Sequence, residues 1–271
     1  MTVVVKIGGA RAVEPAGALA DVAALADDGA DVAVVHGGST YVDETLERMG
    51  IDPEYVETPG GVTGRFTDAE TMAVFTMAMS KLNTDLVAGL HEAGADGVGL
   101  NGVDGRLLYG PRKSAVRVVE DGKRKIRRGD HSGIVKEVNA ALLESLFADD
   151  YVPVVGPPML GDDGTPVNAD ADRAAAAVAG ALGADLVVLT DVAGVYADPA
   201  DPETRIDRVD SPAAMADAEA AAEGFMTKKV MAATEALESG AASVVVADAN
   251  AEDPVRAALD GDGTTFTPEA L

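Results

Sequence analysis

The sequence predicts an α/β protein: a three-layer αβα sandwich with a largely parallel central sheet and two added β-hairpins. Short apolar runs bounded by Gly or Asp alternate along the chain with helical stretches. This alternation is typical of a sheet that helices bury on both faces. The chain has 271 residues, which is enough to enclose a full core. We therefore expect one large α/β unit.

The central sheet is predicted from six apolar runs rich in Val, Leu and Ala. Four of them precede residue 165 and two follow it, which favours an N-terminal lobe (1–165) and a C-terminal lobe (166–271) that share one continuous sheet. The expected core strands are Val3–Ile7, Val32–Val35, Val98–Leu100, Val152–Val155, Leu186–Leu189 and Ser243–Ala247.

Helix boundaries are marked by residues that favour helix ends. A first helix is expected between Pro15 and Gly29, because proline suits the first helical turn and glycine the position after the last. A second is expected from Asp68 to Glu92, where Thr67 and Glu70 have the spacing of a capping box. Further helices are expected at Lys136–Phe147, Asp170–Leu182 and Lys228–Glu238.

Two stretches interrupt the alternation and are predicted to be hairpins. Arg106–Arg128 contains the turn sequence Glu-Asp-Gly-Lys at residues 120–123, and glycine next to an acidic residue favours a tight turn. Met159–Asn168 is a shorter candidate around Asp-Asp-Gly at 162–164.

Composition excludes several classes of function. The formal net charge of −25 and the pI near 4.2 would repel a phosphate backbone, so nucleic acid is not an expected partner. The acids are spread along the chain, which is typical of a salt-adapted surface that remains soluble by self-repulsion. No apolar run approaches the roughly 18 residues that span a bilayer, so we expect a cytoplasmic protein with no membrane partner. The absence of cysteine excludes disulfides and thiolate metal sites.

Two glycine pairs follow early strands and predict an anion site. The first strand ends in Lys6 and runs into Gly8 and Gly9, and the second runs into Gly37 and Gly38. Ligands of open parallel sheets bind at the carboxyl ends of strands, and glycines allow backbone N–H groups to approach an anion. Either pair alone could be a structural turn. Together they indicate one site for several phosphate or carboxylate oxygens.

Arg65 and His36 are two further candidates for a role in or near this site. A glycine-rich loop at 59–64 precedes Arg65, and arginine pairs with carboxylates through two nitrogens, so Arg65 is the candidate for binding a substrate carboxylate. His36 stands next to the second glycine pair. The other histidines, His91 and His131, are not at metal-ligand spacing from it, so a structural role is favoured for His36.

Six short motifs occur along the chain: Lys6-x-Gly8-Gly9, His36-Gly37-Gly38, Arg65-x-Thr67-Asp68, Asn168-Ala169-Asp170, Thr190-Asp191-Val192-x-Gly194 and Met226-x-x-Lys229. In this order they resemble the motifs of the amino acid kinase family, and they look most like its acetylglutamate kinase branch. The resemblance covers nearly the whole chain, and although each motif is weak alone, six in register make it specific.

The resemblance implies the amino acid kinase fold and transfer of the γ-phosphoryl group of ATP to a carboxylate. It implies that Lys6 and Lys229 flank the phosphoryl group and that Asp170 orients them. Mg²⁺ would be held by ATP oxygens, with no protein ligand assigned. The resemblance further implies an amino-acid site and a carrier site in the first lobe, an ATP site in the second, and a homodimer. On the nucleotide side, backbone N–H groups would come from Gly8 and Gly9, with Thr190, Asp191 and Tyr196 nearby. On the substrate side, backbone N–H groups would come from Gly37 and Gly38. The amino acid would be held by Arg65 and Asn168.

A finer resemblance concerns the stretches at 110–116 and 128–139. They are similar to the kinases that act on glutamate or 2-aminoadipate carried by an acidic amino-group carrier protein of the LysW type, in arginine and lysine biosynthesis. The first Asn of the usual acetylglutamate kinase motif Asn-x-Asn-Ala-Asp is replaced by Pro166, which puts the contact to a free acetyl-amino acid in doubt.

Charge supports the same interpretation independently. Residues 106–128 contain nine basic residues against two acids, and an acidic partner fits such a cluster better than a small metabolite does. The hairpin could instead pair with the protein's own acids or with a dimer mate. The expected carrier-docking residues are Arg112, Lys113, Lys123, Arg124, Lys125, Arg127 and Arg128.

Two alternatives remain open at the level of sequence. The first is a kinase of free N-acetylglutamate, and the second is a non-catalytic nucleotide or amino-acid sensor on the same fold. Retention of both lysines and of Asp170 argues against the sensor. Glutamate and aminoadipate are not distinguished.

Overall fold

The central sheet spans both halves of the chain. The computed structural model describes residues 1–8, 14–59, 61, 63–120, 123–198, 200–222 and 225–271. In this part of the chain an 11-stranded sheet has the order β13-β15-β14-β12-β1-β2-β10-β6-β9, with β5 and β11 also paired to β10. Its central strands are β1 (Thr2–Ile7), β2 (Asp31–His36), β10 (Val152–Gly161), β12 (Asp185–Thr190) and β14 (Ser243–Asp248). Its other strands are β5 (Gly97–Gly102), β6 (Leu108–Gly110), β9 (Glu137–Val138), β11 (Pro166–Val167), β13 (Arg208–Val209) and β15 (Thr264–Phe266).

All six predicted core strands are confirmed. β1 lies at the centre of the sheet and pairs in parallel with β2 on one side and β12 on the other. Val3, Val4 and Val5 in β1 are fully buried, as expected for a strand covered on both faces. Antiparallel pairing occurs between β14 and β15, between β6 and β9 and between β10 and β11.

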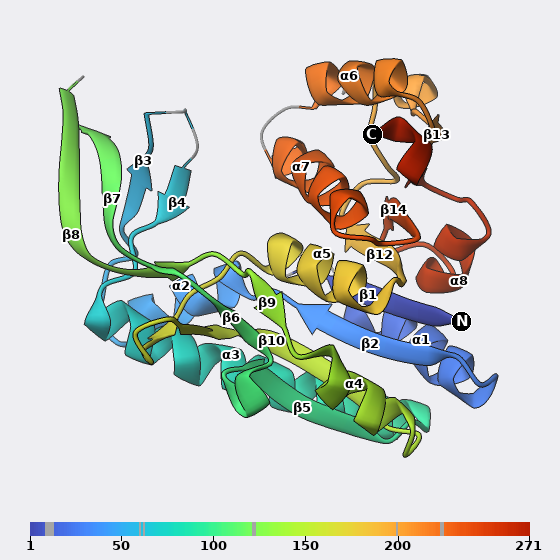
Figure 1. Ribbon diagram of the computed structural model, residues 1–271, viewed down its shortest axis with the longest axis horizontal. Coiled ribbons are helices and arrows are strands. Elements are labelled where there is room, and N and C mark those ends of the chain that lie inside the picture. Colours follow the sequence, from blue (N-terminus) through green and yellow to red (C-terminus); the bar gives the residue numbers. More distant parts are fainter. Residues whose placement is uncertain (9–13, 60, 62, 121–122, 199, 223–224) are drawn as a thin grey trace.

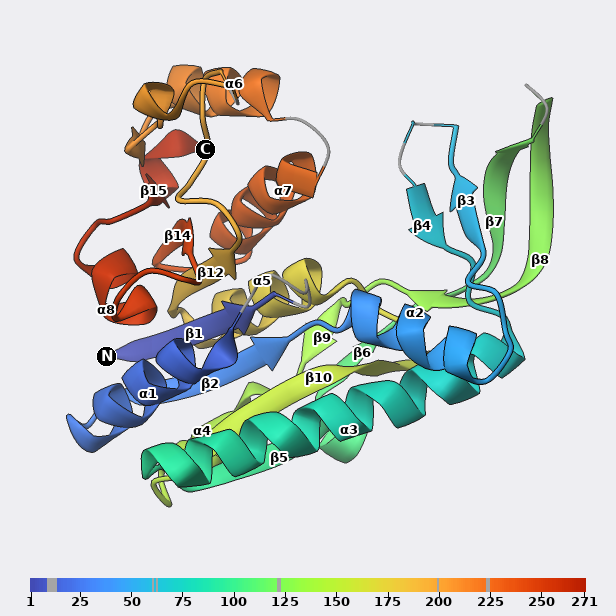
Figure 2. The same ribbon diagram turned by 180° about the vertical axis from the view of Figure 1, so that it is seen from behind.

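Helices cover both faces of the sheet. On the face turned toward the viewer in Figure 1, apolar side chains of α4, α5 and α7 pack on the strands; Figure 2 shows the opposite face, with α1 and α3. Of the two outer helices, α2 packs on α3 and α6 lies against α7. The helices are α1 (Pro15–Asp27), α2 (Ser39–Arg48), α3 (Ala69–Ala93), α4 (Ala140–Phe147), α5 (Ala171–Leu182), α6 (Pro212–Ala221), α7 (Phe225–Glu238) and α8 (Pro254–Leu259). Short 3-10 turns occur at Asp104–Arg106, Pro202–Thr204 and Pro268–Ala270.

The predicted capping box at the start of α3 is wrong by one residue. Asp68, rather than Thr67, is the N-cap, and its side chain accepts a hydrogen bond from the Thr71 N–H. Thr67 is fully buried and bonded to other segments, so it is not available as a cap. The predicted helix at Lys136–Phe147 also begins later than expected, because Glu137–Val138 joins the sheet as β9.

Both predicted hairpins are present, and a third was not anticipated. The long one pairs β7 (Arg112–Glu120) with β8 (Lys123–Gly133), and the short one pairs β10 with β11. The third pairs β3 (Tyr55–Glu57) with β4 (Thr63–Arg65), where the sequence had predicted a loop. Figure 1 shows the β3–β4 and β7–β8 hairpins side by side at one end of the molecule.

None of the helices in the described ranges is both long and apolar enough to cross a lipid bilayer.

Candidate active site

The carboxyl ends of the central parallel strands gather the predicted phosphate-site residues. Lys6 is the penultimate residue of β1, and Thr190 ends the neighbouring β12. Gly8 follows β1, and Gly37 follows β2. Because these strands are parallel and adjacent, their ends lie at one edge of the sheet, where α/β proteins bind ligands.

The structure brings Lys6 and Lys229 to one carboxylate. The Nζ of Lys6 lies 2.5 Å from Oδ1 of Asp172, and the Nζ of Lys229 lies 3.7 Å from Oδ2 of the same side chain. The three side chains come from β1, α5 and α7, and each is exposed by less than one sixth. Both contacts are ion pairs with the same carboxylate. Two ammonium groups that reach one carboxylate can also reach one phosphoryl group.

The charged side chains of this cluster shift one another's pKa values. Burial alone would raise the pKa of the Asp172 carboxyl, but the ammonium groups of Lys6 and Lys229 outweigh burial and lower that pKa. Burial and repulsion from Lys6 lower the pKa of Lys229. The carboxylates of Asp172, Asp191 and Asp170 act on Lys229 in the opposite direction. Asp172 thus helps keep Lys229 protonated, which is the form that binds an anion.

The predicted orienting role of Asp170 requires a correction. The Asp170 carboxylate is the N-cap of α5, where Oδ1 accepts hydrogen bonds from the N–H groups of Asp172 and Arg173 at 3.0 and 3.2 Å. The ion pairs with the lysines are made by Asp172, two residues further on. The first turn of α5 directs Asp172 toward β1 while Asp170 stays at the helix start. In the sequence, the presence of an acidic residue, Asp172, in the first turn of the predicted helix could have indicated this contact.

The glycine pairs are only partly available for anions. The Gly37 N–H is donated to the carbonyl of Ile7 at 3.2 Å within the protein, and its donation to a substrate stays a prediction. Gly38 is the N-cap of α2, and a Cβ there would lie 2.4 Å from Leu82. A glycine is therefore needed for α2 to start against α3. Gly9 lies outside the described residues, and Gly8 follows β1 directly.

Arg65 is held by the protein more firmly than its sequence context suggested. Its Nε and Nη2 bind Asp43 at 3.0 and 2.9 Å, and Nη2 is also 2.8 Å from the hydroxyl of Ser39. The guanidinium lies over the ring of Tyr55. The two-nitrogen fork expected for the substrate is thus taken by Asp43. Among the described residues Nη1 has no hydrogen-bond partner, which leaves this nitrogen for a ligand.

Asn168 is bound to a buried threonine next to Arg65. Its Nδ2 donates to the Oγ1 of Thr67 at 3.3 Å, while the Asn168 amide oxygen has no hydrogen-bond partner within the described part of the chain. Thr67 follows Arg65 by two residues, so the two predicted substrate-binding residues come from adjoining segments. Thr67 thus connects Asn168 to the segment that carries Arg65, and the role of both residues in substrate binding stays a prediction.

Three of the residues predicted for the nucleotide, Thr190, Asp191 and Tyr196, lie in the C-terminal half of the chain. The Thr190 hydroxyl donates to Asp191 at 3.1 Å, and the Asp191 carboxylate is close enough to Lys229 to raise the lysine's pKa. Tyr196 is half-buried and forms an isolated bridge with Arg205. Thr190 and Asp191 are thus grouped with Lys229, whereas for Tyr196 no contact with the lysine cluster is seen among the described residues.

Part of the basic hairpin is used inside the protein. Arg112 pairs with Asp163 at 2.9 Å, and Arg127 pairs with Glu54 and lies over the ring of Phe66. These two arginines anchor the hairpin to its surroundings, and their part in docking a carrier stays a prediction. The buried Val118 lies on the same face of the hairpin as Arg127.

The opposite face of the hairpin carries cations around an apolar residue. Cross-strand partners share a face and successive residues alternate, so Arg117, Ile126, Arg124 and Arg128 lie on the face turned away from Val118. All four are exposed, and Ile126 is 66% exposed. Among the described residues none of these arginines forms an ion pair. Arg117 therefore joins the candidate docking surface, although it was not among the residues expected from the sequence. Lys113, Lys123 and Lys125 are also exposed.

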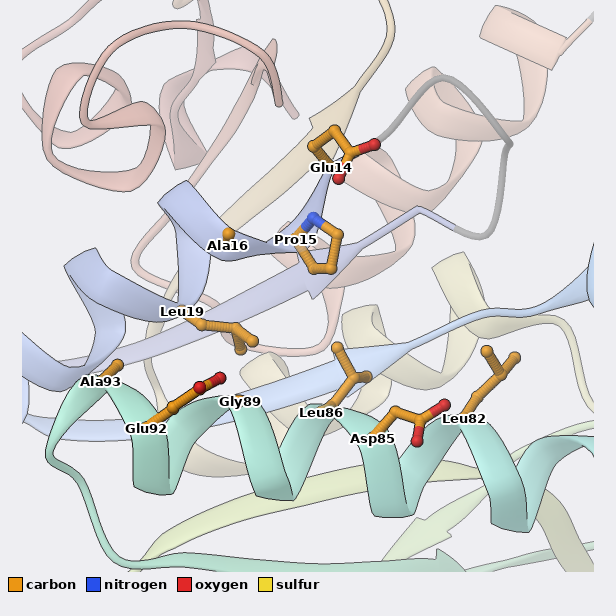
Figure 3. A pocket seen from close by; sticks show the side chains of 10 residues that line it. All are labelled: Glu14, Pro15, Ala16, Leu19, Leu82, Asp85, Leu86, Gly89, Glu92 and Ala93. Carbon is orange, nitrogen blue, oxygen red and sulfur yellow. The ribbon is translucent and has the colours of Figure 1, made fainter.

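A cavity of about 580 Å³ lies elsewhere, between α1 and α3. Figure 3 shows Leu19 and Leu86 in it, together with the carboxylates of Glu14, Asp85 and Glu92. Acidic groups around an apolar floor would repel ATP phosphates, and no residue of the lysine cluster lines the cavity. Among the described residues no group of three or more His, Cys, Asp or Glu side chains could hold a metal ion.

Solved structures with the same fold have low sequence identity to the chain. N-acetylglutamate synthase from Neisseria gonorrhoeae superposes with a TM-score of 0.79 at 22% identity; the match covers 100% of this chain and 60% of the synthase. Carbamate kinase from Giardia lamblia gives 0.66 at 15% identity, with 98% of both chains covered. At these identities the similarity concerns the fold.

Closer similarity is found among sequences. The model of the amino acid kinase family matches residues 1–248. The "[LysW]-aminoadipate kinase" of Thermus thermophilus is 41% identical over 269 residues, covering 97% of this chain and 98% of its own. The "Acetylglutamate kinase" of Methanopyrus kandleri is 42% identical over 265 residues, covering 96% and 98%. The chain therefore belongs to the amino acid kinase family and is a phosphotransferase that acts on a carboxyl group.

Proposed function

We propose that this protein transfers the γ-phosphoryl group of ATP to the side-chain carboxylate of a glutamate or 2-aminoadipate whose amino group is attached to an acidic carrier protein of the LysW type. The convergence of Lys6 and Lys229 on one buried carboxylate carries the proposal of phosphoryl transfer. The relatives that are named for a LysW-linked substrate support the carrier, as does the basic outer face of the β7–β8 hairpin.

Catalysis rests on positioning and charge. A carboxylate with an ordinary pKa near 4.3 is ionised at neutral pH, so the acceptor needs no general base. The two ammonium groups stabilise the negative oxygens of the phosphoryl group as it moves from ATP to the carboxylate. Asp172 holds the lysines at a common point, and the product is an acyl phosphate with ADP as the leaving group.

Substrate and metal are assigned to different parts of the site. Arg65, through the nitrogen that Asp43 leaves unused, and Asn168 bind the amino-acid end. The N–H groups of Gly8 and Gly38, with Thr190 and Asp191 nearby, line the path between donor and acceptor. Oxygens of ATP and water would hold Mg²⁺, with no protein ligand assigned, and the ion would supply further neutralisation of phosphate charge. Lys6 and Lys229 fit this arrangement, because their ammonium groups would add to the neutralisation of phosphate charge.

The experiment compares acceptors. Purified protein is incubated at molar salt with MgATP and hydroxylamine, and the acyl phosphate is trapped as a hydroxamate. The acceptors are a LysW-type carrier with a C-terminal glutamyl group, the same carrier with an aminoadipyl group, and free N-acetylglutamate. We expect turnover with at least one carrier. Faster turnover of free N-acetylglutamate would favour the second candidate function, to which the Methanopyrus relative points.

A further inference from the structure

The base of the basic hairpin is joined to the substrate site through one buried carboxylate. Asp130 lies near the end of β8 and is 3% exposed. Its Oδ1 accepts a hydrogen bond from the Thr67 N–H at 3.3 Å, and its Oδ2 accepts one from the Ser132 hydroxyl. A buried carboxylate that loses its donors is destabilising, so this arrangement fixes Thr67 against β8.

Thr67 is bonded through every polar group of its backbone and through its side chain. Its N–H binds Asp130, its carbonyl accepts from the His131 N–H at 2.7 Å, and its hydroxyl accepts from the Asn168 Nδ2 at 3.3 Å. Thr67 is also fully buried. These bonds and the burial hold Thr67 in place, and two of its three partners, Asp130 and His131, belong to β8.

Asn168 is bonded to the same stretch of β8 by its backbone. Its N–H donates to the His131 carbonyl, and its own carbonyl accepts from the Gly133 N–H, both at 2.8 Å. With the backbone fixed to β8 and the amide nitrogen directed at Thr67, the Asn168 side chain has a defined orientation. Its amide oxygen is left to accept a hydrogen bond, which is what the N–H of an acylated amino group offers.

We propose that Asp130 and Thr67 are positioning residues: they fix the orientation of the Asn168 amide at the substrate site and join it to the base of the β7–β8 hairpin. The inference rests on the proposed function in that it takes the substrate to be an N-acylated amino acid. A free ammonium group has three N–H donors and can bind an amide oxygen from many directions, whereas the single N–H of an acylated amino group must be aligned with it, so a fixed orientation of the Asn168 amide matters most for the acylated form.

The first test is the matched pair Thr67→Val and Thr67→Ser. Valine keeps the buried volume but removes the acceptor for Asn168, whereas serine keeps it. Removing one hydrogen bond of this kind should raise KM for the acylated amino-acid substrate about five- to tenfold, with kcat within about twofold and KM for ATP unchanged. Thr67→Ser should restore the wild-type KM to within about twofold. Equal KM values for the two variants would overturn the proposal, as would an equal rise in KM for ATP.

The second test requires no substrate. Amide hydrogen exchange is compared between the wild type and Asp130→Ala, with Asp130→Asn, which removes the buried charge, as the variant to use should Asp130→Ala not fold. We expect faster exchange in peptides that contain residues 66–68 and in those that contain 130–133, with the β1 and β12 peptides unchanged. Faster exchange in only one of the two segments would contradict the junction. The acceptor comparison with the wild-type protein tests the proposed function, whereas the variants test this inference. A failure of one can therefore be told from a failure of the other.

Discussion

The ammonium nitrogen of Lys6 lies 2.5 Å from a carboxylate oxygen of Asp172, and Lys229 reaches the other oxygen of the same group at 3.7 Å. One lysine comes from the first strand and the other from a helix more than 200 residues later. A single carboxylate thus does two things: it compensates two buried positive charges, and it sets the distance between them. The testable consequences begin with these three residues.

Replacing either lysine should remove transition-state stabilisation. For Lys229→Ala and Lys6→Ala we expect a loss of about 3 kcal/mol or more, on the scale of one preorganised donor, measured as kcat for hydroxamate formation. Lys81→Ala is the control, because Lys81 is exposed on α3 and pairs with Asp85. A Lys229→Ala variant with near-normal kcat would refute the role of this lysine.

Replacing Asp172 should move the alkaline limit of activity. Asp172 raises the pKa of Lys229, while burial and Lys6 lower it. In Asp172→Asn the lysine therefore loses its proton at a lower pH, and the alkaline limb of the kcat profile should shift downward. Asp170→Asn is the matched control, since asparagine also caps helices well. Asp170 raises the pKa of Lys229 less than Asp172 and Asp191 do. A larger shift in Asp170→Asn than in Asp172→Asn would return the orienting role to Asp170.

Arg65 should be sensitive even to lysine. Lysine cannot bind Asp43 with two nitrogens and present a third to the substrate, so Arg65→Lys should raise KM for the amino-acid substrate by about tenfold or more, on the scale of a lost hydrogen bond to a charged group. KM for ATP should not change. Steady-state kinetics with each substrate varied in turn provides the measurement. An unchanged KM for the acceptor would place the substrate carboxylate elsewhere.

Reversing charge on the outer hairpin face should weaken carrier binding. Arg117→Glu combined with Arg124→Glu should raise KM for the carrier-linked substrate by about tenfold or more and should abolish much of its salt dependence. Arg208→Glu changes the charge at an exposed site on β13, in the C-terminal part of the sheet, and should have little effect. Carrier kinetics unaffected by the double change would assign the hairpin to another partner.

His36 predicts a specific pH dependence of stability. Burial lowers the pKa of His36 to about 4, against a smaller opposing effect of the Gly37 carbonyl. Its contribution to stability is therefore present above pH 6.5 and is lost as the pH falls toward 4. Between pH 7.5 and 5.0 this amounts to about 2 kcal/mol of unfolding free energy. Chemical denaturation at constant molar salt should show this loss in the wild type and much less of it in His36→Gln.

Much of the fold was predictable because it depends on local pattern. The buried strands are runs of Val, Leu and Ala, and α1 begins at Pro15, as expected from the sequence. The β3–β4 hairpin was missed because a glycine-rich segment with one arginine has little β pattern, and its pairing depends on cross-strand contacts. Thr67 was assigned to a cap because its spacing fits one, but tertiary hydrogen bonds to Asn168 and His131 take precedence.

The sequence by itself determined the family, the alternation of strands and helices, and the identity of the two lysines, since each depends on residues in a fixed order along the chain. Tertiary structure alone decided that Asp172 rather than Asp170 meets the lysines, that Asp43 occupies the fork of Arg65, and which face of the hairpin carries its exposed arginines. These are choices among nearby side chains of the same kind. The direction in which each side chain points decides between them, and the spacing of residues along the chain does not reveal that direction.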